Sequence, residues 1–161
     1  MKCIRIFGYV LLALLFISTV PYAAEAGNVK IYPKQFKPVD PSNPYNYQTP
    51  GNLLGDGGEA MYYAVVNLPA GKTVTRLVGF RSSPSTTGST EFYLNRSRFG
   101  VADQPVQIMA HISATGFTGA GADAYDDTTI SYPRVKSHFS YYVLVEIEDN
   151  NRVTGVKVVY E

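Results

Sequence analysis

Apolar and polar side chains alternate with a period of two over most of this chain. Residues 139–147 place five apolar side chains on one face of an expected strand: Phe139, Tyr141, Val143, Val145 and Ile147. Similar alternation predicts further strands over 72–81, 90–98, 105–113 and 152–160, separated by Gly-, Pro-, Asn- and Ser-rich turns. Residues 60–68 are apolar on both faces and predict a central strand covered on both sides. We therefore expect an all-β fold, a single antiparallel β-sandwich (jelly-roll-like or Ig-like) of about eight strands.

The alternation also assigns side chains to an inner and an outer face of each expected strand. The positions expected inside are Val74, Val78, Phe80, Phe92, Leu94, Val106, Ile108, Ala110 and Ile112. Tyr93 and His111 then fall on outer faces. The Gly-, Ala- and Asp-rich residues 114–127 predict a long loop, and 128–132 predict a short strand before Pro133.

The first 26 residues have the pattern of a cleaved secretory signal peptide. Lys2 and Arg5 precede an apolar stretch of about 15 residues, which is shorter than the roughly 20 needed to span a bilayer. Cleavage fits after Ala24 or, as we favour, after Ala26; a retained anchor is the alternative. We expect an exported protein, periplasmic or extracellular, with no membrane span in the mature chain. The single cysteine, Cys3, precedes both cleavage points, so the mature chain is expected to have no disulfide.

Residues 27–57 are rich in Pro, Asn and Tyr and predict an extended arm ahead of a sandwich domain over 58–161. A short strand is expected over 28–32. The large side chains of the arm are too apolar for a solvated linker: Tyr32, Phe36, Tyr45, Tyr47, Leu53 and Leu54. We expect them to cover an open edge of the same sandwich, where prolines block edge-to-edge aggregation; a neighbouring subunit is the alternative.

Five strand-and-turn motifs carry a resemblance to known proteins. They are LPAGKTVTRLVGF (68–80), TEFYLNR (90–96), DTTISYPRV (127–135), HFSYYVLVEI (138–147) and GVKVVY (155–160). Together they resemble a family of small exported bacterial β-sandwich domains that has no assigned function. The resemblance runs from about Gly58 to the end of the chain and implies the fold alone, with no catalytic residue.

Charge and motifs exclude several functional classes. A net charge of +1 lacks the concentrated basic face of a nucleic-acid binder. The two histidines, His111 and His138, have no neighbouring ligands at a spacing typical of zinc sites. No Gly-x-Ser-x-Gly motif is present, and Ser137 and His138 are sequence neighbours whose side chains point to opposite sides of a strand.

An acidic cluster offers one candidate metal site. Asp123, Asp126 and Asp127 lie within five residues on the expected Gly-rich loop, and Ca²⁺ favours several oxygen ligands. Aspartate is also a common turn residue, and the EF-hand pattern is absent. We therefore expect no cofactor, with Ca²⁺ as the alternative.

Tyrosine supplies the candidate binding residues. Tyr45 and Tyr47 lie on the arm, and Tyr93 and Tyr142 fall on outward positions of expected strands. An exposed tyrosine combines a flat apolar ring with a hydrogen-bonding tip, which suits a sugar or a protein partner. Tyrosine is also a frequent strand residue, and the chain has no tryptophan, the usual stacking platform for sugars.

These features together favour a non-enzymatic exported module of the cell envelope, either binding (carbohydrate or protein partner) or structural. One alternative is a hydrolase of envelope polysaccharide that uses Asp123 and Asp126 as an acid/base pair. The other is a self-associating coat or fibre subunit, which the near-neutral charge and the proline-rich arm would suit.

Overall fold

The computed structural model describes residues 26–40, 47–48, 51–54, 59–82, 88–101, 104–115 and 122–161. These residues form eleven strands, one 3₁₀ turn and no α-helix. The short N-terminal elements are β1 (Gly27–Ile31), η1 (Pro33–Gln35), β2 (Lys37–Pro38), β3 (Tyr47–Gln48) and β4 (Asn52–Leu54). The longer strands are β5 (Ala60–Val65), β6 (Val74–Ser82), β7 (Ser89–Arg98), β8 (Gln107–Thr115), β9 (Ala122–Asp127), β10 (Phe139–Ile147) and β11 (Arg152–Tyr160).

The N-terminal 25 residues, and so almost all of the expected signal peptide, lie outside the described residues. A search of the described part of the chain finds no helix with the length and hydropathy needed to cross a membrane.

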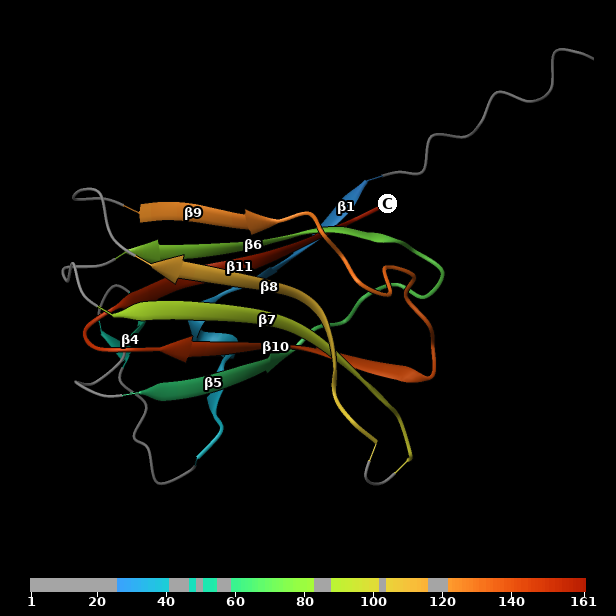
Figure 1. The fold of residues 1–161 in the computed structure, drawn as a ribbon, viewed down its shortest axis with the longest axis horizontal. Coiled ribbons are helices and arrows are strands. Elements are labelled where there is room, and N and C mark those ends of the chain that lie inside the picture. The colour runs from blue at the N-terminus through green and yellow to red at the C-terminus, as the bar shows by residue number, and fades with distance from the viewer. Residues whose placement is uncertain are drawn as a thin grey trace, which may run out of the picture.

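The strands form two antiparallel sheets that pack as a sandwich (Figure 1). The β11 sheet has the order β3-β4-β11-β6-β9, with β1 also paired to β11 beside the C-terminus. The β10 sheet has the order β2-β5-β10-β7-β8. The antiparallel sandwich expected from the sequence is confirmed. Successive strands repeatedly change sheets, which agrees with the jelly-roll-like form of that expectation.

The core lies between the two sheets and follows the expected alternation on β7 and β10. Phe92 and Leu94 of β7 and Val143 and Val145 of β10 are fully buried. On β6, Gly79 leaves room for a core ring, because a Cβ there would lie 2.7 Å from the Phe92 side chain. The two sheets thus approach closely where a glycine faces an aromatic residue.

The prediction that Val106 and Ile108 face the core is wrong. Leu94 pairs with Ala110 and Asn95 pairs with Ile108, which leaves Met109 as an extra residue in β8. Such a β-bulge shifts the alternation by one position. Val106 and Ile108 are consequently each 51% exposed, whereas Met109 is buried.

A second irregularity overturns part of the expected facing of β6. Arg76 pairs with Val159 and Val74 pairs with Tyr160, so Thr75 has no partner in β11. Val74 is in the core as expected, but beyond Thr75 the inward positions are Leu77, Gly79 and Arg81. Val78 is nevertheless buried, at 4% exposed, as expected. The prediction was wrong for Phe80, which alternates to the outer face and is only partly buried.

The segment expected as a loop over 114–127 ends in a strand instead. Ala122–Asp127 forms β9, an edge strand that pairs with β6. The strand expected over 128–132 is absent, and Tyr132 has a positive φ of 53°. The expectation failed because edge pairing with β6, a tertiary contact, fixes β9 despite its Gly-, Ala- and Asp-rich sequence.

The arm contributes both strands and core side chains. β1 confirms the strand expected over 28–32, and β2 pairs with the outer edge of β5. Phe36, Leu53 and Leu54 are buried as expected, but Tyr32 is 54% exposed. The side chains of Tyr45 and Tyr47 lie outside the described residues. The arm residues that are described thus form part of the sandwich of their own chain.

Candidate functional site

A hollow of about 360 Å³ lies on the outer face of the β10 sheet. We call it the tyrosine hollow. Strands β7, β8 and β10, with the residue before β8, line it with Tyr93, Asn95, Val106, Ile108, Tyr142, Leu144 and Glu146. Its volume falls in the lower part of the range typical of small-molecule sites, roughly 300–1,000 Å³. The lining combines aromatic and aliphatic surface with one amide and one carboxylate.

Strand register brings these side chains together. Tyr93 lies directly opposite Leu144, and Asn95 lies directly opposite Tyr142. The outward positions of β7 and β10 therefore form adjacent rows on one face. The bulge at Met109 completes the lining, because it turns Ile108 outward beside Asn95.

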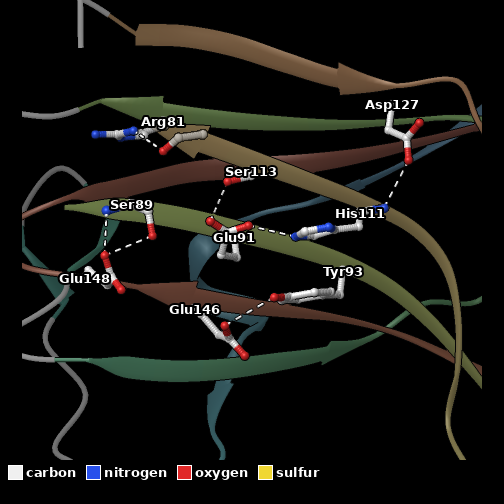
Figure 2. A network of polar contacts seen from close by, with 10 residues as sticks. Arg81, Ser89, Glu91, Tyr93, His111, Ser113, Asp127, Glu146 and Glu148 are labelled. Atoms are coloured by element: carbon white, nitrogen blue, oxygen red, sulfur yellow. Dashed lines mark hydrogen bonds and ion pairs between the residues drawn. The ribbon is translucent and has the colours of Figure 1, made fainter. Parts of the chain in front are cut away.

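The imidazole of His111 holds the Tyr93 ring in place. The two rings stack with centroids 4.5 Å apart and planes inclined by only 4°. His111 is itself fixed by Glu91, whose Oε2 lies 2.7 Å from Nε2, and Ser113 Oγ donates to the other carboxylate oxygen at 2.7 Å (Figure 2). The aromatic surface of Tyr93 is therefore supported from behind by a hydrogen-bonded network.

The same network joins the edges of the two sheets. The backbone N–H of His111 in β8 donates to Oδ2 of Asp127 in β9 at 3.0 Å (Figure 2). The other carboxylate oxygen of Asp127 accepts the backbone N–H of Thr129 at 2.6 Å. His111 is thus anchored through both its backbone and its side chain.

Glu146 gives the tyrosine hollow its electrostatic character. Burial, together with the negative charges of Glu59 and Glu91, raises the pKa of Glu146; a hydrogen bond from Tyr93 and the proximity of His111 partly oppose this. Tyr93 Oη donates to Glu146 Oε2 across 3.4 Å. Burial and the negative charges of Glu146 and Glu91 raise the pKa of Tyr93, and burial raises the pKa of Tyr142. Both tyrosines therefore keep their hydroxyl protons at neutral pH and are available as donors.

Asn95 adds a polar group at the base of the hollow. Asn95 is 3% exposed, and its Oδ1 has no hydrogen-bond partner among the described residues. A buried amide oxygen without a partner is costly, and a ligand hydroxyl that reached it would satisfy it.

Two of the four tyrosines predicted from the sequence meet in this site. Tyr93 and Tyr142 both line the tyrosine hollow. Tyr45 lies outside the described residues, and of Tyr47 only the backbone is described, paired with Leu53 through β3 and β4. The four residues therefore do not form one described cluster.

The three aspartates predicted as a calcium site lie on strand β9 rather than on a loop. Asp126 faces outward and accepts a hydrogen bond from Arg76 Nε at 2.9 Å. Asp123 and Asp127 alternate to the other side, where Asp127 bonds to His111. The described residues contain no group of three Asp, Glu, His or Cys side chains that could hold a metal ion. The same alternation separates Asp123 from Asp126 as an acid/base pair.

Most of the remaining lining was not predicted from the sequence. Leu144 and Glu146 could have been found, because they share the period-two outer face with Tyr142. Val106 and Ile108 left no such signal, since the bulge that exposes them depends on how β8 pairs with β7.

No protein-family model and no curated protein matches this chain. Solved structures of similar fold include a family two carbohydrate esterase from Cellvibrio japonicus, at 6% identity and a TM-score of 0.48 over 83% of this chain and 34% of that chain. This chain thus spans only about a third of the esterase.

Two carbohydrate-binding modules are also similar in fold. The C-terminal CBM6 of a laminarinase from Zobellia galactanivorans is 12% identical, with a TM-score of 0.48 over 82% of this chain and 98% of that chain. A module of Cellvibrio mixtus lichenase 5A, solved with cellotriose, is 13% identical, with a TM-score of 0.44 over 81% of this chain and 95% of that chain.

Proposed function

We propose that this protein is an exported, non-catalytic carbohydrate-binding module of the cell envelope, and that the tyrosine hollow holds a sugar ring. The stack of Tyr93 on His111 is the observation that carries the proposal. A pyranose has a flat face of C–H groups, which packs on a rigid aromatic surface, and a rim of hydroxyls. Because Tyr93 is already immobilised, binding would cost little side-chain entropy.

The polar groups of the hollow match the rim of such a ring. Glu146 accepts hydrogen bonds, both tyrosine hydroxyls donate and accept, and Asn95 presents an amide. Val106 and Ile108 would cover apolar edges of the sugar. A mostly apolar site with a few polar groups is the usual form of a small-molecule site.

The purified protein should first be screened on a glycan array, with and without Ca²⁺, and the best neutral oligosaccharide titrated by calorimetry. Tyr93→Ala and Tyr142→Ala should each weaken binding by about tenfold or more, because each removes stacking surface. Phe99→Ala is the control: it removes an exposed aromatic side chain that does not line the tyrosine hollow and should leave the affinity unchanged. Wild-type affinity in both hollow variants would overturn the proposal.

One observation favours a second candidate, a polysaccharide hydrolase. Glu146 and Glu91 lie directly opposite each other on β10 and β7, and glycosidases use paired carboxylates. Both carboxylate oxygens of Glu91 are already engaged by His111 and Ser113, which favours binding over catalysis. Release of reducing ends from the bound glycan, abolished by Glu146→Gln, would support the hydrolase instead.

A further inference from the structure

The outer face of the β11 sheet carries a second hollow, also of about 360 Å³, on the opposite side of the sandwich. We call it the lysine hollow. The residues that give it its chemistry are Lys30, Tyr32, Phe80, Gly155 and Lys157. It shares no residue with the tyrosine hollow.

Two ammonium groups flank this hollow without a balancing carboxylate. Lys30 of β1 and Lys157 of β11 are directly opposite each other in the strand register. Among the described residues, neither makes an ion pair, whereas the nearby Arg76 is neutralised by Asp126. Like charges directly opposite each other destabilise a sheet. An anion placed between the two lysines would remove this repulsion.

The floor and walls of the lysine hollow are flat and apolar. Gly155 has no side chain, so the floor is backbone, and a Cβ there would lie 3.2 Å from the carbonyl oxygen of Ile31. Phe80 lies directly opposite Gly155, and its ring centroid is 5.8 Å from the Lys157 ammonium. Tyr32, 54% exposed, supplies a second aromatic ring.

We propose that the lysine hollow is a binding site for a uronic acid residue, a sugar ring that carries a carboxylate. The carboxylate would lie between Lys30 and Lys157, and the ring would pack against Phe80 and Tyr32 over Gly155. Two cations suit one carboxylate, whereas an anionic lipid surface typically requires clusters of four to eight basic residues. A nucleic acid would require a wider basic face than a chain of net charge +1 provides.

The test compares acidic and neutral sugars of the same ring geometry. Galacturonate and galactose, then their trimers, are titrated into the ¹⁵N-labelled protein while amide signals are followed by NMR. Galacturonate should shift the signals of Gly155 and Lys157, and galactose should not. Inorganic phosphate is titrated in a separate experiment. If phosphate bound as tightly as galacturonate, the hollow would be an anion site with no specificity for the sugar ring, and the proposal would be overturned.

Variants then test whether the charges of Lys30 and Lys157 are needed for binding. The double variant Lys30→Gln/Lys157→Gln should weaken galacturonate binding by about tenfold or more, since it removes two charge-assisted hydrogen bonds. Lys37→Gln, which removes an exposed lysine of the β10 sheet, is the matched control and should bind normally. Its melting temperature and that of the double variant should both stay at or above the wild-type value. Unchanged affinity in the folded double variant would overturn the proposal.

The proposals for the two hollows can be tested independently of each other. Tyr93→Ala should leave galacturonate binding intact, and the double lysine variant should leave binding of the neutral oligosaccharide intact. If either variant lost binding of both galacturonate and the neutral oligosaccharide, a separate uronate site would be contradicted. If Tyr93→Ala lost binding of the neutral oligosaccharide alone, the result would support two separate sites.

Discussion

The ring of Tyr93 lies almost parallel to the imidazole of His111, with centroids 4.5 Å apart. The pair joins neighbouring strands, since Tyr93 and His111 are directly opposite each other on β7 and β8. Glu91 fixes the imidazole from the adjacent row. The binding surface of the tyrosine hollow therefore depends on residues that do not line it.

This relationship predicts that His111→Ala weakens sugar binding although His111 is not among the lining residues. Without the imidazole, Tyr93 regains rotamer freedom that binding must then remove, at a cost of about 0.5–1.5 kcal/mol. Calorimetry should show a less favourable entropy of binding. His111→Phe should restore part of the affinity because it keeps a stacking ring; equal losses in both variants would refute a stacking role.

The bulge at Met109 predicts stability effects of very different size for two isoleucines of the same strand. Ile108 is 51% exposed and Ile112 is 4% exposed. Ile108→Ala should change the free energy of unfolding by about 0.5 kcal/mol or less, whereas Ile112→Ala should cost about 2–5 kcal/mol. Urea denaturation measures both. A large loss in the Ile108 variant would mean that the unbulged alternation is correct after all.

Glu146 of β10 and Glu148, just after the end of β10, should affect the pH dependence of stability with opposite sign. The pKa of Glu146 is raised above its ordinary value of 4.5, chiefly by burial, so its ionisation favours the unfolded chain and stability falls as pH rises above about 4.5. Glu146→Gln should therefore gain in melting temperature relative to wild type between pH 4 and 7. Equal slopes for the two proteins would contradict this.

Glu148 should behave in the reverse manner. Hydrogen bonds from the backbone N–H and the hydroxyl of Ser89, each 2.9 Å, lower the pKa of Glu148 (Figure 2). Its stabilising contribution is present above its ordinary pKa and is lost as pH falls through the lowered value. Thermal melts of Glu148→Gln should show a deficit at pH 7 that disappears at acid pH.

Substitution of the buried Arg81 should destabilise the fold. It is fully buried at the end of β6, where its guanidinium donates to the carbonyl oxygen of Ala114 and, at 2.8 Å, to Oδ1 of Asn151. Arg81→Met should cost about 2 kcal/mol or more, because two buried acceptors lose their donor. Arg76→Met, at an exposed ion pair, is the control and should cost less than about 1 kcal/mol. Equal losses in the two variants would contradict this role of Arg81.

The fold class and part of the tyrosine hollow follow from the order of residues along the chain. A period of two depends only on neighbouring residues, so it located β7 and β10 and placed Tyr93 and Tyr142 on outer faces. The large apolar side chains of the arm also led to the correct prediction that Phe36 and Leu53 are buried, because such side chains are costly in solvent.

Which outer positions meet depends instead on how the strands pair. The bulge at Thr75 is set by pairing of β6 with β11 and the bulge at Met109 by pairing of β8 with β7, and each reverses the facing of the residues beyond it. One bulge exposes Ile108 to the tyrosine hollow, and the other turns Phe80 outward to the lysine hollow. The opposition of Lys30 and Lys157, far apart in the chain, likewise exists only through the register of β1 on β11. Local periodicity carries no information on register, because register is fixed by contacts between one strand and another.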